Sequence, residues 1–433
     1  MFKKYKKYLI AFIISLTLGY GASYFWDIYH YLPFQKKEIH IFFETHATAP
    51  ALSQIIEFSK LPKETKKIIG WSRFPNRGQV FDLDEYNTVE IPVVKNQPFA
   101  NLINLTTTVL DEISETPSAA IVIHASFDKV ATSVKPLLSF IPKQRIKAIH
   151  LYEDGYGDVL KWNDAVSNET TLFMDTLKQE TAELLEPENK NIWLIRNVFG
   201  LRYFYPVTYH FLKASQFKNI KRLQSIFTKF NDLNLVETNF YTLAQTLTPE
   251  QKKIVFKLSG FDYEKYKNLM LNKKSIMFVT GFHFGFKPYM DAEIKVLSLL
   301  KENKLENFKL ENPQDYVWFF KPHPAYDEIY KEEVIKKTFP DIIEIPPEVP
   351  FEVFILAGLK PTLTAGFSSS LFFSLNKEDI LFYAKRPQYN TSPMAMLDDH
   401  YLAALSTDGI VSNEQVIFYE HFFEKPSSTP TEQ

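Results

Sequence analysis

Residues 119–155 read AAIVIHASFDKVATSVKPLLSFIPKQRIKAIHLYEDG, and this stretch decides the fold. Two short apolar runs, Ala119–His124 and Ile146–Tyr152, flank the amphipathic stretch Val130–Ile141. The apolar runs predict buried strands, and the amphipathic stretch predicts a helix. A strand, a helix and a second strand in this order predict a parallel sheet that is covered by helices on both faces.

The same alternation continues along the chain in both directions. Further strands are expected at Glu38–Glu44, Lys67–Trp71, Asn191–Ile195, Ser275–Thr280, Tyr316–Phe320, Ile342–Ile345 and Ile380–Tyr383. Helices are expected at Leu52–Ser59, Ala100–Ile113, His210–Phe230, Pro249–Leu258, Met290–Glu302, Glu328–Lys337 and Glu352–Ala357. We therefore predict an α/β protein with two Rossmann-like, doubly wound domains, residues 38–199 and 200–412, that face a central cleft. Ligands of such sheets bind beyond the carboxyl ends of the strands.

Composition excludes several classes of protein. The 433 residues are 45% hydrophobic and 23% charged, as in an ordinary globular protein and unlike a disordered or polytopic membrane protein. The formal net charge is −2, so no basic excess indicates nucleic-acid binding. Cysteine is absent, which excludes disulfides, thiolate metal sites and cysteine nucleophiles.

The N-terminal segment, residues 1–37, predicts a membrane anchor. Lys3, Lys4, Lys6 and Lys7 precede an uncharged stretch from Tyr8 to Trp26, which is long enough to approach the ~30 Å of a bilayer core. The lysines predict that the N-terminus faces the cytoplasm, and a bacterial inner membrane is the expected location. A cleaved signal peptide is the alternative. At the other end, residues 425–433 are expected to be disordered.

Four polar segments follow expected strands or begin expected helices. Glu153-Asp154-Gly155 follows a strand, where burial can give a carboxylate the pKa of a general base; a solvated turn is the alternative. Lys321-Pro322-His323-Pro324 holds a histidine in stiff backbone, which suits a proton donor or phosphate ligand, although a stiff surface loop explains it equally well.

The other two segments begin helices. Glu352 lies in an expected first turn, where an acidic residue is ordinary but could also accept hydrogen bonds from ribose hydroxyls. Gly366-Phe367-Ser368-Ser369-Ser370 precedes a helical stretch, and hydroxyls with backbone N–H groups at a helix N-terminus favour an anion. Asp82-Leu83-Asp84 has the spacing of a metal-binding pair, but its polar surroundings favour a solvated loop.

These four segments, in this order, resemble the bacterial sialyltransferases of glycosyltransferase family 80, of the Pasteurella and Photobacterium type. The likeness runs from about residue 38 to 424. It includes Trp71-Ser72-Arg73, Gly260-Phe261-Asp262, Phe351-Glu352-Val353, Gly358-Leu359-Lys360-Pro361 and Ser369-Ser370-Leu371-Phe372-Phe373-Ser374.

The resemblance implies a GT-B architecture and an inverting transfer of sialic acid from CMP-Neu5Ac to a galactoside of a surface glycan such as a lipooligosaccharide. It implies that Asp154 is the general base and that His323 assists the departure of CMP. It also implies that a C-terminal helix, residues 413–424, returns to the first domain. The remaining residues implied at the site are Lys321, Pro322, Pro324, Glu352, Ser369, Ser370 and Gly281 for the CMP donor, and Arg73, Asn96 and His124 for the sugar or acceptor. No metal cofactor is implied.

The sequence departs from the family in three places. Glu153 stands where the family usually has an aspartate, and Pro322 stands where it has a glycine. The stretch Thr280-Gly281-Phe282-His283-Phe284-Gly285 replaces a threonine-rich run that ends in a tryptophan beside the acceptor. The donor site is therefore expected to be kept and the acceptor site to be changed. Two alternatives stay open: a GT-B transferase that uses another CMP-activated acid such as Kdo, and a non-catalytic, membrane-tethered glycan-binding protein.

Overall fold

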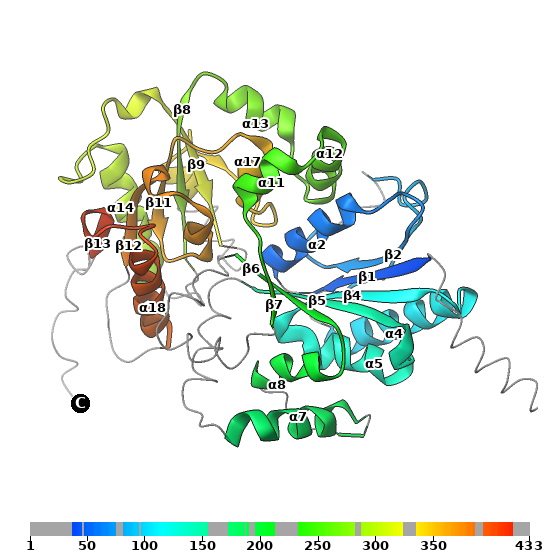
Figure 1. Cartoon of the computed structure of the whole chain (residues 1–433). Coiled ribbons are helices and arrows are strands. Elements are labelled where there is room, and N and C mark those ends of the chain that lie inside the picture. The colour runs from blue at the N-terminus through cyan, green and yellow to red at the C-terminus, as the bar shows by residue number, and fades with distance from the viewer. Residues whose placement is uncertain are drawn as a thin grey trace, which may run out of the picture.

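The computed structural model describes two parallel sheets, each in its own α/β domain, that lie side by side (Figure 1). The described residues are 37–45, 47–74, 81–94, 97–154, 172–186, 188–189, 195–212, 233–281, 287–323, 335–385 and 393–418.

The first sheet has seven strands in the order β3-β2-β1-β4-β5-β6-β7, and every neighbouring pair is parallel. Their bounds are β1 Glu38–Glu44, β2 Lys66–Trp71, β3 Thr88–Glu90, β4 Ala120–Ser126, β5 Ile146–Tyr152, β6 Val207–Phe211 and β7 Asn234–Glu237. The central strands are buried along almost their whole length, because helices cover both faces. The strands expected at Glu38–Glu44 and Ile146–Tyr152 are confirmed to the residue.

The second sheet has six strands in the order β10-β9-β8-β11-β12-β13, again all parallel. Their bounds are β8 Lys274–Val279, β9 Tyr316–Lys321, β10 Ile343–Glu344, β11 Leu363–Phe367, β12 Ile380–Lys385 and β13 Val416–Phe418. The chain changes direction across the sheet between β8 and β11. Such a switch point is where an open parallel sheet binds its ligand.

Helices cover the sheets and join the two domains. Their bounds are α2 Thr48–Lys60, α4 Pro98–Glu115, α5 Lys135–Phe140, α7 Leu172–Leu185, α8 Ile195–Gly200, α11 Phe240–Thr246, α12 Pro249–Leu258, α13 Tyr263–Met270, α14 Lys287–Lys301, α16 Lys336–Thr338, α17 Glu352–Ala357 and α18 Pro393–Thr407. α2 lies on one face of the first sheet, and α4 and α5 lie on the other (Figure 1). α12 contacts both α2 and α17, so it connects the cores of the two domains.

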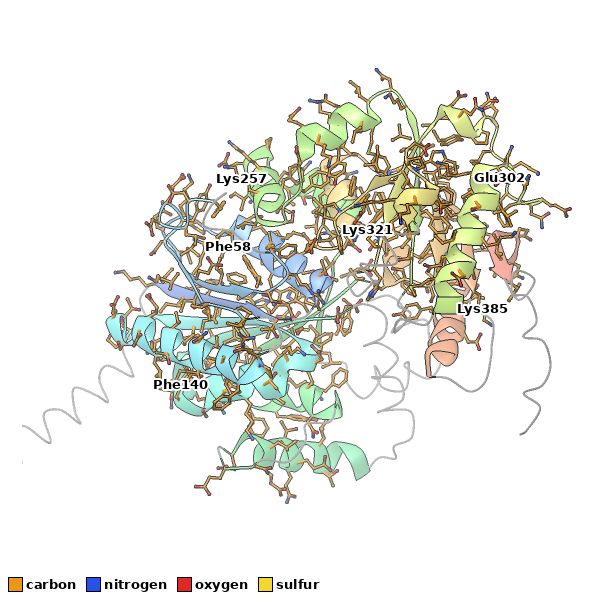
Figure 2. The ribbon with its side chains drawn as sticks, turned by 180° about the vertical axis from the view of Figure 1, so that it is seen from behind. Phe58, Phe140, Lys257, Glu302, Lys321 and Lys385 are labelled. Carbon is orange, nitrogen blue, oxygen red and sulfur yellow. The ribbon has the colours of Figure 1, made fainter. Side chains whose placement is uncertain are left out.

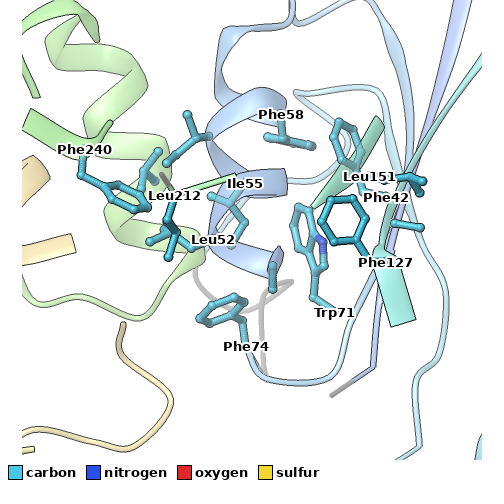
Figure 3. Packing of buried hydrophobic residues seen from close by; sticks show 14 of the residues in the cluster. Phe42, Leu52, Ile55, Phe58, Trp71, Phe74, Phe127, Leu151, Leu212 and Phe240 are labelled. Carbon is cyan, nitrogen blue, oxygen red and sulfur yellow. The ribbon is translucent and has the colours of Figure 1, made fainter. Parts of the chain in front are cut away.

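The face of the first sheet under α2 has an aromatic core. Phe42, Phe58 and Trp71 pack against one another (Figure 3), and the ring centroids of each pair are 6.0 Å apart. The indole N–H of Trp71 donates to Gln54 Oε1 at 2.8 Å, which satisfies its only polar atom inside the core. This packing holds α2 against the sheet. The first turn of α2 borders the pocket between the two domains.

Three expectations about the chain's organisation are wrong. The boundary at residues 199 and 200 falls too early, because β6 and β7 belong to the first sheet. The helix expected from His210 is also wrong at its start, because Val207–Phe211 is a mostly buried strand that pairs with β5. The helix expected at 413–424 is instead a 3₁₀ turn, Asn413–Gln415, followed by β13 of the second sheet; residues 419–424 lie outside the described residues.

Other expectations fall on residues that the structure does not describe. They concern the lysines and apolar stretch of residues 1–36, the tail 425–433, and residues 191–194 of an expected strand whose last residue, Ile195, begins α8. Among the described residues, no helix has the length and apolar character needed to cross a bilayer.

Replacing Gly366 by alanine is expected to destabilise the second domain. Gly366 has φ +141°, and an added Cβ would lie 2.1 Å from the carbonyl oxygen of Val279 on the neighbouring strand. Strain and overlap together should lower the free energy of unfolding by about 2–4 kcal/mol, measured in urea. Gly358→Ala is the control: φ is +70° and no atom lies within 4 Å, so about 1–2 kcal/mol is expected. Equal losses for both variants would contradict the packing argument.

Candidate active site

A cavity of about 210 Å³ lies between the two domains and is lined by both. The first domain contributes Ala47, Thr48, Ala49, Arg73 and Asp154, and the second contributes Val279, Thr280, Lys321, Pro322, His323, Pro347, Pro350, Phe351, Glu352, Ser369, Ser370 and Leu371. Figure 2 shows one of the lining residues, Lys321, between Phe58 of the first domain and Lys385 of the second. Residues from the carboxyl ends of strands in two sheets therefore meet in one pocket.

The first domain brings a carboxylate and a guanidinium to the pocket. Asp154 stands two residues after the last residue of β5, and its side chain is exposed. Arg73 follows β2, and the pocket is completed on this side by Thr48 at the start of α2, directly after β1. Because β2, β1 and β5 are parallel members of one sheet, their carboxyl ends bring these groups to the same edge.

The second domain brings an imidazole held by its backbone. The N–H of His323 donates to Thr280 Oγ1 at 2.9 Å, which ties the end of β9 to the end of β8. Lys321 Nζ donates to the carbonyl oxygens of Pro322 and Pro347 at 3.2 and 3.1 Å. The amine of Lys321 thus braces the loop that carries His323.

Glu352 lies at the start of α17 and is buried. Burial raises the pKa of its carboxyl, while its own backbone N–H, the Ser374 hydroxyl and the charge of Lys321 oppose that rise. Ser374 Oγ donates to Glu352 Oε1 at 3.1 Å, which fixes the carboxyl group against the pocket wall. A carboxylate held in this way can accept hydrogen bonds from two neighbouring hydroxyls of a ligand.

A serine pair borders the pocket at the end of β11. Ser369 caps the 3₁₀ turn η7, Ser370–Ser374, and its Oγ accepts the N–H of Leu371 at 3.4 Å. The preceding Ser368 does not line the pocket; its hydroxyl is buried and accepts a hydrogen bond from Tyr383 OH at 2.7 Å. The buried pair Ser368 and Tyr383 holds the loop, which leaves the hydroxyl groups of Ser369 and Ser370 at the pocket.

The pocket thus joins most of the residues expected from the sequence. It includes Asp154, His323, Lys321, Pro322, Glu352, Ser369, Ser370 and Arg73. Gly281 does not line it; its N–H donates instead to Glu293 Oε1 on α14. Asn96 and Pro324 lie outside the described residues.

His124 is also absent from the pocket lining, and its expected contact with the acceptor stays a prediction. It is buried in a row of side chains that crosses the first sheet. His40 Nδ1 lies 3.1 Å from His124 Nε2, and His124 Nδ1 lies 2.8 Å from the Tyr152 hydroxyl. Strand register explains this placement, because His124 pairs with His150 in β5 and the two rings stack 4.8 Å apart.

This histidine row predicts that the protein loses stability in mild acid. His210 Nε2 lies 2.9 Å from His150 Nδ1, so His210 also belongs to the row. Burial lowers the pKa of His40 to about 4 and of His210 to about 3, below the ~6.5 of an unfolded histidine. The unfolded chain therefore binds more protons as pH falls below about 6.5, and each histidine should cost about 2 kcal/mol of folding free energy by pH 5. Urea unfolding at pH 7.5 and 5 measures the loss. His210→Gln, which keeps a polar partner for His150, should show a shallower pH dependence; an unchanged dependence would contradict the assignment.

Sequence reasoning missed several residues of the pocket. Ala47, Thr48 and Ala49 at the start of α2 were not singled out, although small residues after the first strand of a Rossmann-like domain are a usable signal. The sequence indicated Thr280 only as the first residue of the segment that differs from the family. In the structure its hydroxyl accepts the backbone N–H of His323 and so positions that residue. Among the described residues, no group of three or more histidine, aspartate or glutamate side chains could hold a metal ion.

Comparison with solved structures gives the class of protein. A Photobacterium damselae sialyltransferase, residues 113–497 corresponding to its GT-B domain, matches with a TM-score of 0.72 and 20% identity over 88% of this chain and 99% of that one. An α/β-galactoside α-2,3-sialyltransferase from Photobacterium phosphoreum matches at 0.68 and 20% identity, over 88% and 98% of the two chains. A Photobacterium 2,6-sialyltransferase, solved with CMP and lactose, matches at 0.71 and 20% identity, over 88% and 78%. The fold is therefore GT-B.

The family follows from the sequence match. The model of the sialyltransferase PMO188 family matches residues 39–406, and the chain belongs to this family. It is therefore a sialyltransferase, which is a class of glycosyltransferase. Comparison with curated proteins gave no significant match.

Proposed function

We propose that the protein transfers sialic acid from CMP-Neu5Ac to a hydroxyl of a galactoside, with inversion at the anomeric carbon. The observation that carries this proposal is the shared pocket, in which Asp154 of the first domain faces a cavity bordered by His323, Ser369 and Ser370 of the second. CMP and lactose in the Photobacterium 2,6-sialyltransferase structure support the choice of donor and acceptor.

In the proposed reaction, Asp154 accepts the proton of the acceptor hydroxyl as its oxygen attacks the anomeric carbon of the sialyl group. The bond between that carbon and the phosphate oxygen of CMP breaks, and its electron pair stays on the phosphate. His323 donates a hydrogen bond or a proton to this leaving oxygen. Attack from the face opposite the departing CMP gives inversion.

Donor binding is assigned to the second domain. Ser369, Ser370 and the N–H groups of the turn that follows them would bind the phosphate, and Glu352 would accept hydrogen bonds from the ribose. CMP leaves as a phosphate monoester rather than a pyrophosphate. Hydroxyls, one imidazole and backbone N–H groups could stabilise this charge, and we propose a reaction that needs no metal cofactor.

A donor panel tests the proposal. The purified chain is incubated with lactose and either CMP-Neu5Ac or CMP-Kdo, with and without excess EDTA, and released CMP and product mass are measured. Sialyl-lactose from CMP-Neu5Ac, formed equally with EDTA, is the expected result. Transfer from CMP-Kdo alone would favour the other CMP-activated acid, and strict metal dependence would contradict the metal-free mechanism.

We also propose that residues 8–26 anchor the protein in a bacterial inner membrane, so that it acts on a surface glycan such as a lipooligosaccharide. The uncharged stretch and the four lysines before it support this attachment. Fractionation of cells should recover the chain with membranes. A reporter fused after Gln433 would identify the side on which the catalytic domains lie.

A further inference from the structure

The outward face of α4 carries exposed apolar side chains. Phe99, Ile103 and Leu110 are 73%, 49% and 42% exposed, and Val94 just before the helix is 40% exposed. At 100° per residue, Phe99, Ile103 and Leu110 fall within about 40° of one another around the helix axis. Phe99, Ile103 and Leu110, here called the α4 stripe, form one line along three turns of the helix, and Val94 lies in the loop before it.

α4 does not need this stripe for its own packing. The helix already buries Asn101, Leu105 and Val109 on another side, and Ile113 in its last turn. A surface helix ordinarily places charged residues on its outer face. Residues 97–110 contain no charged residue at all, whereas α12 carries Glu250, Lys252, Lys253 and Lys257 within ten residues.

Hydrogen bonds hold the loop before α4 to the helix. The N–H of Val94 donates to Asn101 Oδ1 at 2.7 Å, and Asn101 Nδ2 donates back to the carbonyl oxygen of Val94 at 3.0 Å. Asn104 Nδ2 donates to the carbonyl oxygen of Pro92 at 2.8 Å, which fixes the same loop. The loop before α4 is therefore held to the first turns of the helix, which carry Phe99 and Ile103.

The position of Lys37 indicates what covers the stripe. Lys37 lies in one cavity with Glu112, Glu115 and Thr116, at the C-terminal end of α4. The chain before it holds the 19 uncharged residues 8–26 and then only ten residues, 27–36, which span at most about 35 Å. α4 itself is about 27 Å long. An apolar segment inserted in a bilayer would thus keep α4 within reach of the lipid surface.

We propose that the α4 stripe rests on the surface of a lipid bilayer, with Phe99 and Ile103 in the boundary between head groups and acyl chains. Apolar side chains of an interfacial helix bury to about this depth. The stripe orients the two domains, while residues 8–26 supply the attachment. This inference depends on the proposed membrane attachment and not on sialyl transfer, so the two can fail separately.

The absence of cysteine gives a direct test. Phe99→Cys and Ile103→Cys place a single thiol on the stripe, and Leu271→Cys is the matched control, an apolar residue 57% exposed between α13 and β8 of the second domain. Each full-length variant is labelled with an environment-sensitive fluorophore and reconstituted into phosphatidylethanolamine–phosphatidylglycerol vesicles. Some of the vesicles carry nitroxide groups on their acyl chains. All three substitutions replace exposed residues, so folding and transfer to soluble lactose should be retained.

Nitroxide lipids should quench the labels at residues 99 and 103 at least about twofold and leave the label at 271 unchanged. Equal quenching at all three positions, or none at 99 and 103 in vesicle-bound protein, would overturn the proposal. So would a failure of the full chain to bind vesicles. If the label at 99 is protected from aqueous iodide without vesicles, another part of the chain or a second copy covers the stripe. That result would also refute the proposal.

Discussion

Replacing Asp154 by alanine is expected to lower kcat for sialyl transfer by about 10²–10⁴-fold while leaving the affinity for CMP nearly unchanged. Asp154 is the pocket carboxylate on the first domain, and the residues assigned to CMP all lie on the second. Loss of the base therefore removes proton transfer without removing contacts to the nucleotide. Single-turnover transfer to lactose and calorimetric titration with CMP measure the two effects separately.

The neighbouring acid supplies the matched control. Glu153 is buried and does not line the pocket, so Glu153→Gln should leave kcat within about tenfold of the native rate. Asp154→Asn, which keeps the shape of the side chain, should be as inactive as Asp154→Ala. A native rate for Asp154→Asn, or a larger loss for Glu153→Gln than for Asp154→Asn, would show that the base is assigned to the wrong residue.

Replacing both Ser369 and Ser370 by alanine should weaken CMP binding by about 10²-fold or more, because each lost hydrogen bond to a charged phosphate is worth about 1.5–3 kcal/mol. The loss should appear in the Kd of CMP and in KM for the donor. KM for lactose should stay close to the native value, since the acceptor is assigned to the other domain. Titration calorimetry with CMP is the direct measurement.

Ser368→Ala separates phosphate binding from support of the loop. Its hydroxyl is bonded to Tyr383 and is away from the pocket lining, so this variant should lower stability more than CMP affinity. If Ser368→Ala weakens CMP binding as much as the double variant does, the hydroxyls of Ser369 and Ser370 are not phosphate ligands. The pair then acts only on the conformation of the loop.

Much of the donor side could be predicted from local pattern. His323 follows the expected strand Tyr316–Phe320, and the serine pair was expected at the start of a helical stretch, although β11, the strand before the pair, was not expected. Both line the pocket. The acceptor side was harder to predict, because His124 also ends an apolar run and yet does not line the pocket. Its ring lies within the sheet rather than beyond it, since β4 extends two residues further than expected, to Ser126.

Local sequence patterns were enough to locate most strands, the polar residues that end several of them and the family that the chain resembles, because strand periodicity and short motifs are local properties. The three-dimensional fold was needed to show that β6 and β7 complete the first sheet and that β13 closes the second. It also decided that His124 stacks on His150 and that Arg73 and Asp154 meet His323 across one cavity. Strand order, register and the packing of α12 between the domains depend on contacts between residues far apart in the chain, which no local pattern specifies.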